Sequence, residues 1–148
     1  MFWSSSTYDE RLLSWVALRD SSASNGLEEY LTEVNDWWFQ APFVNRYIHP
    51  QDIGSWPTPW ELLADNLYCE LSRALGMMYT LMLTNHSEIN DLAIMCLDNE
   101  YILSINTSKY LLNYQTNRIL PTATENIDTA YIIVSSTHTD LLAKTGME

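Results

Sequence analysis

The apolar residues in the first half of the chain recur at the three- and four-residue spacing of amphipathic helices. The clearest case is the segment 27–39, in which the positions that share one helical face are Leu27, Tyr30, Leu31, Val34, Trp37 and Trp38. The same spacing predicts helices over residues 8–19 and 70–83. Gly76 interrupts the last of these and indicates close packing at that point.

Two of the predicted helices begin with a recognisable cap. Thr7 and Glu10 have the spacing of a capping box, in which the two side chains each bind a backbone N–H at the helix start. Thr58 and Glu61 repeat that spacing, and Pro59 between them suits the first helical position. We therefore interpret Trp56, Thr58, Pro59 and Glu61 as a structural motif that fixes a loop and starts a short helix.

After residue 85 the pattern changes to short runs of apolar and β-branched residues. Residues 92–97 and 101–105 flank Asp98-Asn99, which predicts a β-hairpin. Residues 110–114 form a further strand or a turn, and residues 131–134 a further strand. Because helices come first and strands second, we predict an α+β fold with a small antiparallel sheet.

The length of 148 residues predicts one domain. Within it, we expect residues 1–6 to form an N-terminal tail, residues 7–84 to be mainly helical and residues 85–148 to be mainly strands. The first residues have neither a basic region nor an apolar core, so we expect no targeting segment.

Charge and composition narrow the possible partners. The net charge is −12 with only seven Lys and Arg, which argues against nucleic acid, because phosphate contacts need clustered cations. The apolar runs are too short for a membrane span. Cys69 and Cys96 lack metal-site spacing; free thiols in a reducing compartment are the simpler interpretation, and a disulfide between them stays open. We expect no cofactor and no metal.

All six tryptophans lie within the first sixty residues. The simpler interpretation places them in the core of the helical layer. The alternative is that some of them anchor a partner, since tryptophan is enriched in interfaces. The candidates for that role are Phe2, Trp3, Trp37 and Trp38. Residues 1–6 would then be disordered in a monomer and ordered only against a neighbour.

One stretch resembles a known family. Trp56-Pro57-Thr58-Pro59-Trp60-Glu61-Leu62-Leu63, followed by Cys69-Glu70, is similar to the Trp-x-Thr-Pro-x-Glu segment and helix-opening cysteine of the bacterial transglutaminase-like cysteine proteinases. Val34-Asn35 resembles the preceding helix of that family, and the likeness covers about residues 27–114. It implies a papain-like core with a cysteine nucleophile at Cys69.

The chain departs from the family at the positions that carry the chemistry. Leu67-Tyr68 stands where the family has Gly-Asp before the cysteine. Leu92, or Asp91, stands in place of the family's histidine, and Asn106 is nearest to its aspartate. A cysteine nucleophile needs a base within hydrogen-bond reach, and leucine cannot act as one.

Three histidines are the remaining candidates for that base. His86 could serve only if its loop folds back towards Cys69. His49 and His138 are most simply surface or turn residues, and His138-Thr139-Asp140 does not make a metal site. Without a base, Cys69 is explained as a small buried residue at a helix start.

These observations leave three classes of function open. We expect a noncatalytic binding or structural module of a multi-copy protein assembly, with a bacteriophage virion (head–tail connector, neck or baseplate, assembled in the host cytoplasm) as the setting. Otherwise we expect a cytoplasmic protein. The alternatives are a cysteine peptidase or amidase that uses Cys69 with His86, and a regulatory protein that binds a single host target.

Overall fold

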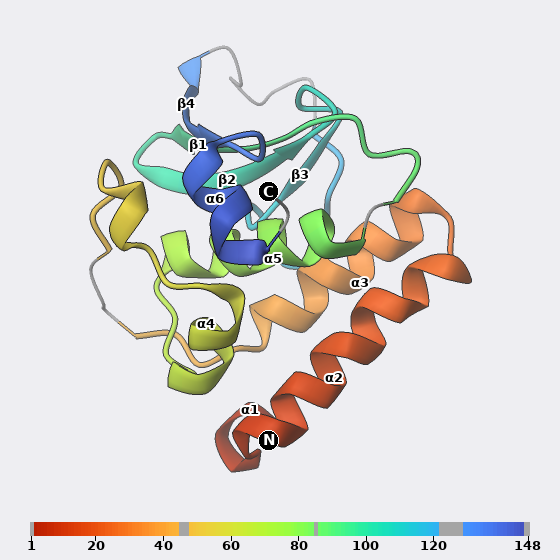
Figure 1. The fold of residues 1–148 in the computed structure, drawn as a ribbon. Coiled ribbons are helices and arrows are strands. Elements are labelled where there is room, and N and C mark those ends of the chain that lie inside the picture. The colour runs from red at the N-terminus through yellow and green to blue at the C-terminus, as the bar shows by residue number, and fades with distance from the viewer. Residues whose placement is uncertain (1, 45–47, 85, 122–128, 147–148) are drawn as a thin grey trace.

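A computed structural model describes residues 2–44, 48–84, 86–121 and 129–146, and it shows an α+β fold (Figure 1). Helices and one sheet form separate parts of the molecule, as the order of the elements predicts. The α-helices are α1 (Phe2–Ser5), α2 (Tyr8–Asp20), α3 (Leu27–Phe39), α4 (Pro59–Asp65), α5 (Glu70–Thr84) and α6 (Thr139–Thr145). The strands are β1 (Leu92–Leu97), β2 (Glu100–Ile105), β3 (Tyr110–Leu112) and β4 (Tyr131–Ser135), and two short 3-10 turns are η1 (Ser21–Ala23) and η2 (Ile53–Ser55).

The sheet is antiparallel, with the strand order β3-β2-β1-β4. β1 and β2 form the predicted hairpin, in which Leu92 pairs with Ile105 and Leu97 with Glu100. The two turn residues Asp98 and Asn99 both have positive φ (51° and 65°), as a tight hairpin turn requires. The local sequence therefore fixes the register of the central pair of strands.

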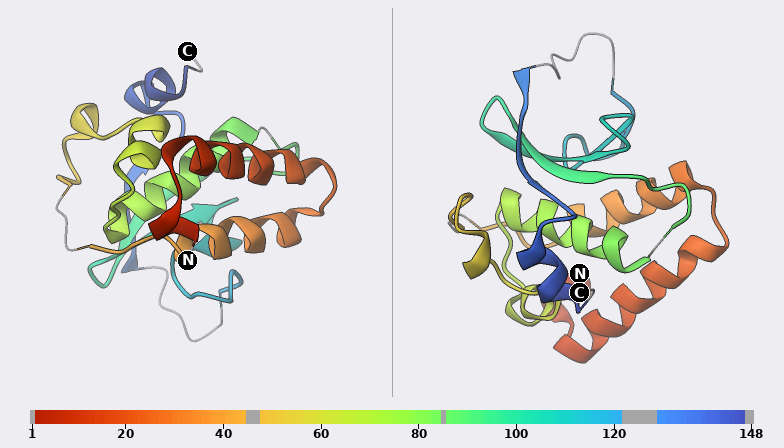
Figure 2. Two further views of the ribbon diagram at one scale, coloured as in Figure 1. Left: turned by 90° about the horizontal axis from the view of Figure 1, so that it is seen from below. Right: turned by 45° about the horizontal axis from the view of Figure 1, so that its top comes forward.

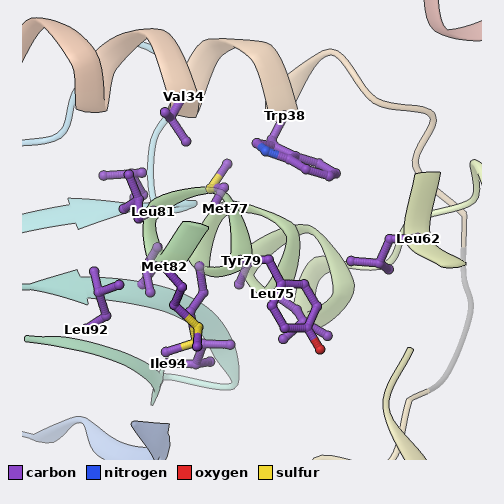
Figure 3. Packing of buried hydrophobic residues seen from close by; sticks show 14 of the residues in the cluster. Val34, Trp38, Leu62, Leu75, Met77, Tyr79, Leu81, Met82, Leu92 and Ile94 are labelled. Carbon is purple, nitrogen blue, oxygen red and sulfur yellow. The ribbon is translucent and has the colours of Figure 1, made fainter. Parts of the chain in front are cut away.

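The central element of the core is α5, which lies between the sheet and the α2–α3 pair (Figures 1 and 2). Every residue from Leu71 to Met82 except Arg73 is buried, so both the sheet and the helices pack against it. Figure 3 shows Trp38 and Val34 of α3 above this helix and Leu92 and Ile94 of β1 below it. A Cβ on Gly76 would lie 2.6 Å from the Trp38 ring, which confirms the close packing expected there.

A single hydroxyl joins three helices inside this core. The indole Nε1 groups of Trp15 in α2 and Trp38 in α3 both donate to Thr80 Oγ1, at 2.8 and 3.0 Å. The Thr80 hydroxyl in turn donates to the carbonyl of Gly76 at 2.7 Å. Its donor and both of its acceptor sites are therefore in use.

The N-terminal segment differs from its prediction. Residues 2–5 form α1 rather than a free tail, and Trp3 is only 3% exposed. Its ring lies 4.5 Å from Trp37 and 5.6 Å from Tyr68, measured between ring centroids, and its carbonyl accepts a hydrogen bond from Asn66. The Trp3 ring is therefore buried against residues of this same chain. No signal in the sequence near Trp3 indicates these distant contacts.

The four candidate anchors therefore separate into two groups. Trp3 and Trp38 are core residues, so the expectation that they meet a partner is wrong for both. Phe2 is exposed and Trp37 is partly buried, with its indole N–H donating to Ser14. For these two residues a partner contact stays a prediction.

The C-terminal helix α6 is absent from the sequence-based assignment. His138 caps its start, because Nδ1 accepts from the backbone N–H of Asp140. Gly146 ends it with a positive φ of 77°. The region after residue 85, which was expected to be mainly strands, therefore also contains a helix. His138 is the N-cap of that helix.

Candidate functional site

The site singled out by the sequence is the start of α5, where Cys69 precedes the first helical residue. The capping boxes of Thr7 and Thr58 are both present, so α4 begins as predicted. Trp56 is buried ahead of it, and its indole N–H donates to the carbonyl of His49. The turn after α4 passes through Asn66, whose φ is 53°, and leads directly to Tyr68 and Cys69.

The hydrogen bonds of Cys69 run through its backbone. Its N–H donates to Ser72 Oγ at 2.8 Å, and the Ser72 hydroxyl donates to the Cys69 carbonyl at 3.1 Å. The residue is 9% exposed, and Cys69 and Cys96 are both buried free thiols. This confirms that Cys69 is a small buried residue at a helix start.

Polar side chains nearby connect α5 to the sheet. Glu70 Oε1 accepts from the backbone N–H of Tyr101 at 2.7 Å, at the start of β2. Arg73 Nε donates to Asn113 Oδ1 at 2.6 Å. Asn113 Nδ2 donates to the carbonyls of Glu70 and Tyr101, so one amide joins the helix to the hairpin.

Burial shapes the ionisation of the two charged residues here. It raises the pKa of the Glu70 carboxyl, although the Tyr101 N–H and Arg73 act in the opposite direction. Burial also lowers the pKa of the Arg73 guanidinium, which is packed over the Phe39 ring at 4.2 Å. Glu70 and Arg73 both bind the start of α5 to neighbouring segments, through Tyr101 and Asn113. Neither is a histidine that could act as the base for a cysteine nucleophile.

A second amide extends this network to α3. The buried Asn35 accepts from the backbone N–H of Asn113 and donates to the carbonyls of Gln115 and Thr116. Asn113 itself has a positive φ of 63°, which asparagine tolerates better than most residues. These roles of Asn35 and Asn113 were not predicted from the sequence, in which the available signal was an asparagine directly after a short strand.

Leu92 and Asn106, which the resemblance sets against a catalytic histidine and aspartate, lie at the other end of α5 from Cys69. Leu92 lines a hollow of about 200 Å³ together with Leu81, Met82 and His86. Leu81 is eleven residues beyond Glu70, a separation of about 16 Å along a helix. The structure therefore does not bring Cys69 together with His86 or Leu92.

Asn106 and Asp91 stabilise the turns at this far end. Asn106 Oδ1 accepts from the backbone N–H of Asn90 at 2.7 Å, and its Nδ2 donates to the Glu88 carbonyl. Asp91 accepts from the backbone N–H and the hydroxyl of Thr107. Both side chains are thus occupied by local backbone and hydroxyl groups.

The three histidines share one local arrangement. In His49, His86 and His138, Nδ1 accepts from the backbone N–H two residues further on. His86 also stacks on Tyr30, at 6.4 Å between ring centroids. Each ring stabilises its own turn, in agreement with the interpretation of His49 and His138 as turn residues.

Comparison with known proteins gives no further assignment: no family model, curated protein or solved structure matches the chain. In the part of the chain that the structure describes, no three His, Cys, Asp or Glu side chains are grouped as a metal ion would require. Over the same residues, no helix has the length and apolar character needed to span a bilayer. The α+β class and the geometry of α5 are therefore the basis for any functional argument.

Proposed function

We propose that this chain is a noncatalytic binding or structural module of a larger protein assembly, built on a transglutaminase-like core without the family's catalytic triad. The observation that carries the proposal is the arrangement along α5. Cys69 is at the start of this helix, whereas His86 and Leu92 line a hollow at its far end. General-base catalysis needs the base within hydrogen-bond reach of the thiol, and two groups at opposite ends of a helix of this length do not meet that condition.

The side chains at the far end support the same conclusion. Asn106 and Asp91 bind backbone groups of neighbouring turns, as expected for residues kept for structure. The buried thiol of Cys69 is poorly placed to meet a substrate. A fold kept without its chemistry is best explained by selection for a surface that binds another protein.

We place this module in a bacteriophage virion, as a multi-copy component of a head–tail connector, neck or baseplate assembled in the host cytoplasm. The support is analogy with small, acidic, catalytically empty versions of enzyme folds. The net charge of −12 favours a basic or polar protein partner. Mass measurement of the native complex from its source would distinguish a multi-copy assembly from a regulator bound to a single target.

The first test of the proposal is the variant Cys69→Ala. We expect it to support assembly as well as the wild type does, because no step depends on the thiol. Complementation or an assembly assay measures this, and Cys96→Ala is the matched control, since Cys96 is also a buried free thiol. A folded Cys69→Ala protein that no longer functions, beside an active Cys96→Ala protein, would contradict the noncatalytic proposal.

Thiol labelling gives a second, independent measurement. Burial should slow the reaction of Cys69 with iodoacetamide at neutral pH, so that it reacts no faster than Cys96. Rapid and selective modification of Cys69 would favour the cysteine peptidase or amidase alternative.

A further inference from the structure

A carboxylate oxygen of helix α3 is buried without a hydrogen-bond partner. Asp36 Oδ1 is closed off from solvent, and no group of the described residues donates to it. The large majority of buried polar atoms in folded proteins are hydrogen-bonded, so this exception needs an explanation. A ligand is such an explanation, because a buried carboxylate is costly until a donor or a cation meets it.

Asp36 lines a hollow of about 240 Å³ between the end of α3 and the turn 115–118, which we call the Asp36 hollow. The other residues that line it are Phe39, Gln40, Thr116 and Asn117. Asp36 and Phe39 are half-buried, whereas the other three side chains are exposed. The hollow therefore has a carboxylate on its inner side and a rim of neutral side chains that carry oxygen atoms.

The turn is held against α3 before any ligand binds. The buried Asn35 side chain, next to Asp36, donates to the carbonyls of Gln115 and Thr116 at 2.9 and 3.1 Å. Gln115 and Arg118 form an antiparallel bridge, which closes the turn. Both walls of the Asp36 hollow are thus fixed in advance, so little ordering entropy is lost on binding.

The cations of this region do not meet the carboxylate. Arg73 is packed over the Phe39 ring at 4.2 Å, and its Nε donates to Asn113. Arg118, in the turn itself, has interactions of its own. Neither donates to Asp36 Oδ1, and α3 contains no Lys or Arg. The position is therefore open to a cation from another molecule.

We propose that the Asp36 hollow binds the guanidinium group of an arginine side chain on a partner protein. A guanidinium carries five N–H donors in one plane, and it pairs with a carboxylate through two parallel hydrogen bonds. Asp36 supplies that carboxylate. The remaining N–H groups meet a rim of amide and hydroxyl oxygens, from Gln40, Thr116 and Asn117. This inference rests on the proposed function, and it adds the location and the chemistry of the contact.

The probe is N-acetyl-L-arginine methylamide, titrated into the isotope-labelled full chain and followed by NMR. Binding in the Asp36 hollow should be saturable and should shift the side-chain amide signals of Gln40 and Asn117. The matched probe is the citrulline compound, which has the same shape without the charge. It should bind about tenfold more weakly, because hydrogen bonds to a charged group are the stronger ones. The lysine compound should fall between the two, since an ammonium group cannot form the paired contact.

The decisive variant is Asp36→Asn, which keeps the shape of the side chain and removes its charge. It should weaken binding of the arginine probe by about tenfold. Glu29→Gln is the matched control, because Glu29 is exposed on the same helix and its replacement changes the net charge equally. That control should leave the affinity nearly unchanged. Since the buried oxygen of Asp36 has no partner in the free chain, Asp36→Asn should melt no lower than the wild type.

Several results would overturn the inference. They are failure of the arginine probe to bind, equal binding of the citrulline probe, equal binding to Asp36→Asn, and an equal loss of affinity with Glu29→Gln. A lower melting temperature of Asp36→Asn would show that the carboxylate already serves the fold.

Two further titrations test other ligands. Tighter binding of free L-arginine than of the capped probe would make the ligand a small molecule. The same shifts produced by calcium chloride at lower concentration would make it a metal ion, and either result overturns the partner's arginine. The Cys69→Ala assembly assay does not involve the Asp36 hollow. Failure of the arginine probe beside an active Cys69→Ala protein would therefore reject the arginine site and leave the proposed function standing.

Discussion

Replacement of Thr80 by valine is expected to destabilise the protein by about 2–6 kcal/mol, although the two side chains have nearly the same shape. Valine offers no acceptor to the indole N–H groups of Trp15 and Trp38, which are both buried. Each buried donor left without a partner costs about 1–3 kcal/mol. In a chain of this size each kcal/mol lowers the melting temperature by about 2–4 °C, so thermal unfolding will measure the loss.

Thr80→Ser and Thr84→Val are the controls for this prediction. Serine keeps the hydroxyl, so most of the stability should return. Thr84 donates to the Thr80 carbonyl and meets the Tyr30 hydroxyl, but it lies at the partly buried end of α5, and its loss should cost less. Equal melting of Thr80→Val and wild type would show that the shared hydroxyl contributes nothing to the stability.

Replacement of Trp3 by alanine should cost about 3–5 kcal/mol, the usual range for removing a buried aromatic side chain. The ring packs against Trp37, Trp38 and Tyr68, so its loss leaves a cavity between α1, α3 and the start of α5. Chemical denaturation of the purified variant measures the change in the free energy of unfolding.

The neighbouring Phe2→Ala is the matched control for Trp3→Ala. Phe2 is exposed, and its replacement should leave the unfolding transition nearly unchanged. If Trp3→Ala also unfolds like the wild type, then α1 is dispensable for the fold, and the original expectation of a free tail would be restored.

The elements that were predicted well carry their signals locally. Helix α3 has an uninterrupted apolar face, α2 and α4 have capping boxes, and the hairpin has Asp98-Asn99 at its turn. Each of these signals acts over a few residues, so it can be read without knowledge of the rest of the chain.

The elements that were missed depend on contacts between distant residues. Helix α1 is only four residues long, and it is positioned by the burial of Trp3 against residues more than thirty positions away. Helix α6 is seven residues long and begins with a histidine cap, an uncommon choice, although Lys144 and Gly146 are ordinary signals of a helix end.

The candidate site was predicted in its parts and not in its arrangement. The position of Cys69 at a helix start and the absence of a histidine at Leu92 were both read from the residues. Sequence spacing does not specify which end of α5 each strand meets. The bond from Tyr101 to Glu70 sets that direction, because it fixes the start of β2 to the start of the helix.

The hydrogen bonds to the Thr80 hydroxyl also make two indole protons useful reporters of the opening of the helical layer to solvent. The indole protons of Trp15 and Trp38 reach water only when α2 or α3 separates from α5, because both are held at the meeting point of the three helices. Their exchange with deuterium should therefore follow the opening of the whole layer. The indole proton of Trp37 is bound to Ser14 at the partly buried edge and should exchange earlier. Three tryptophans in one protein thus report separately on its core and its margin.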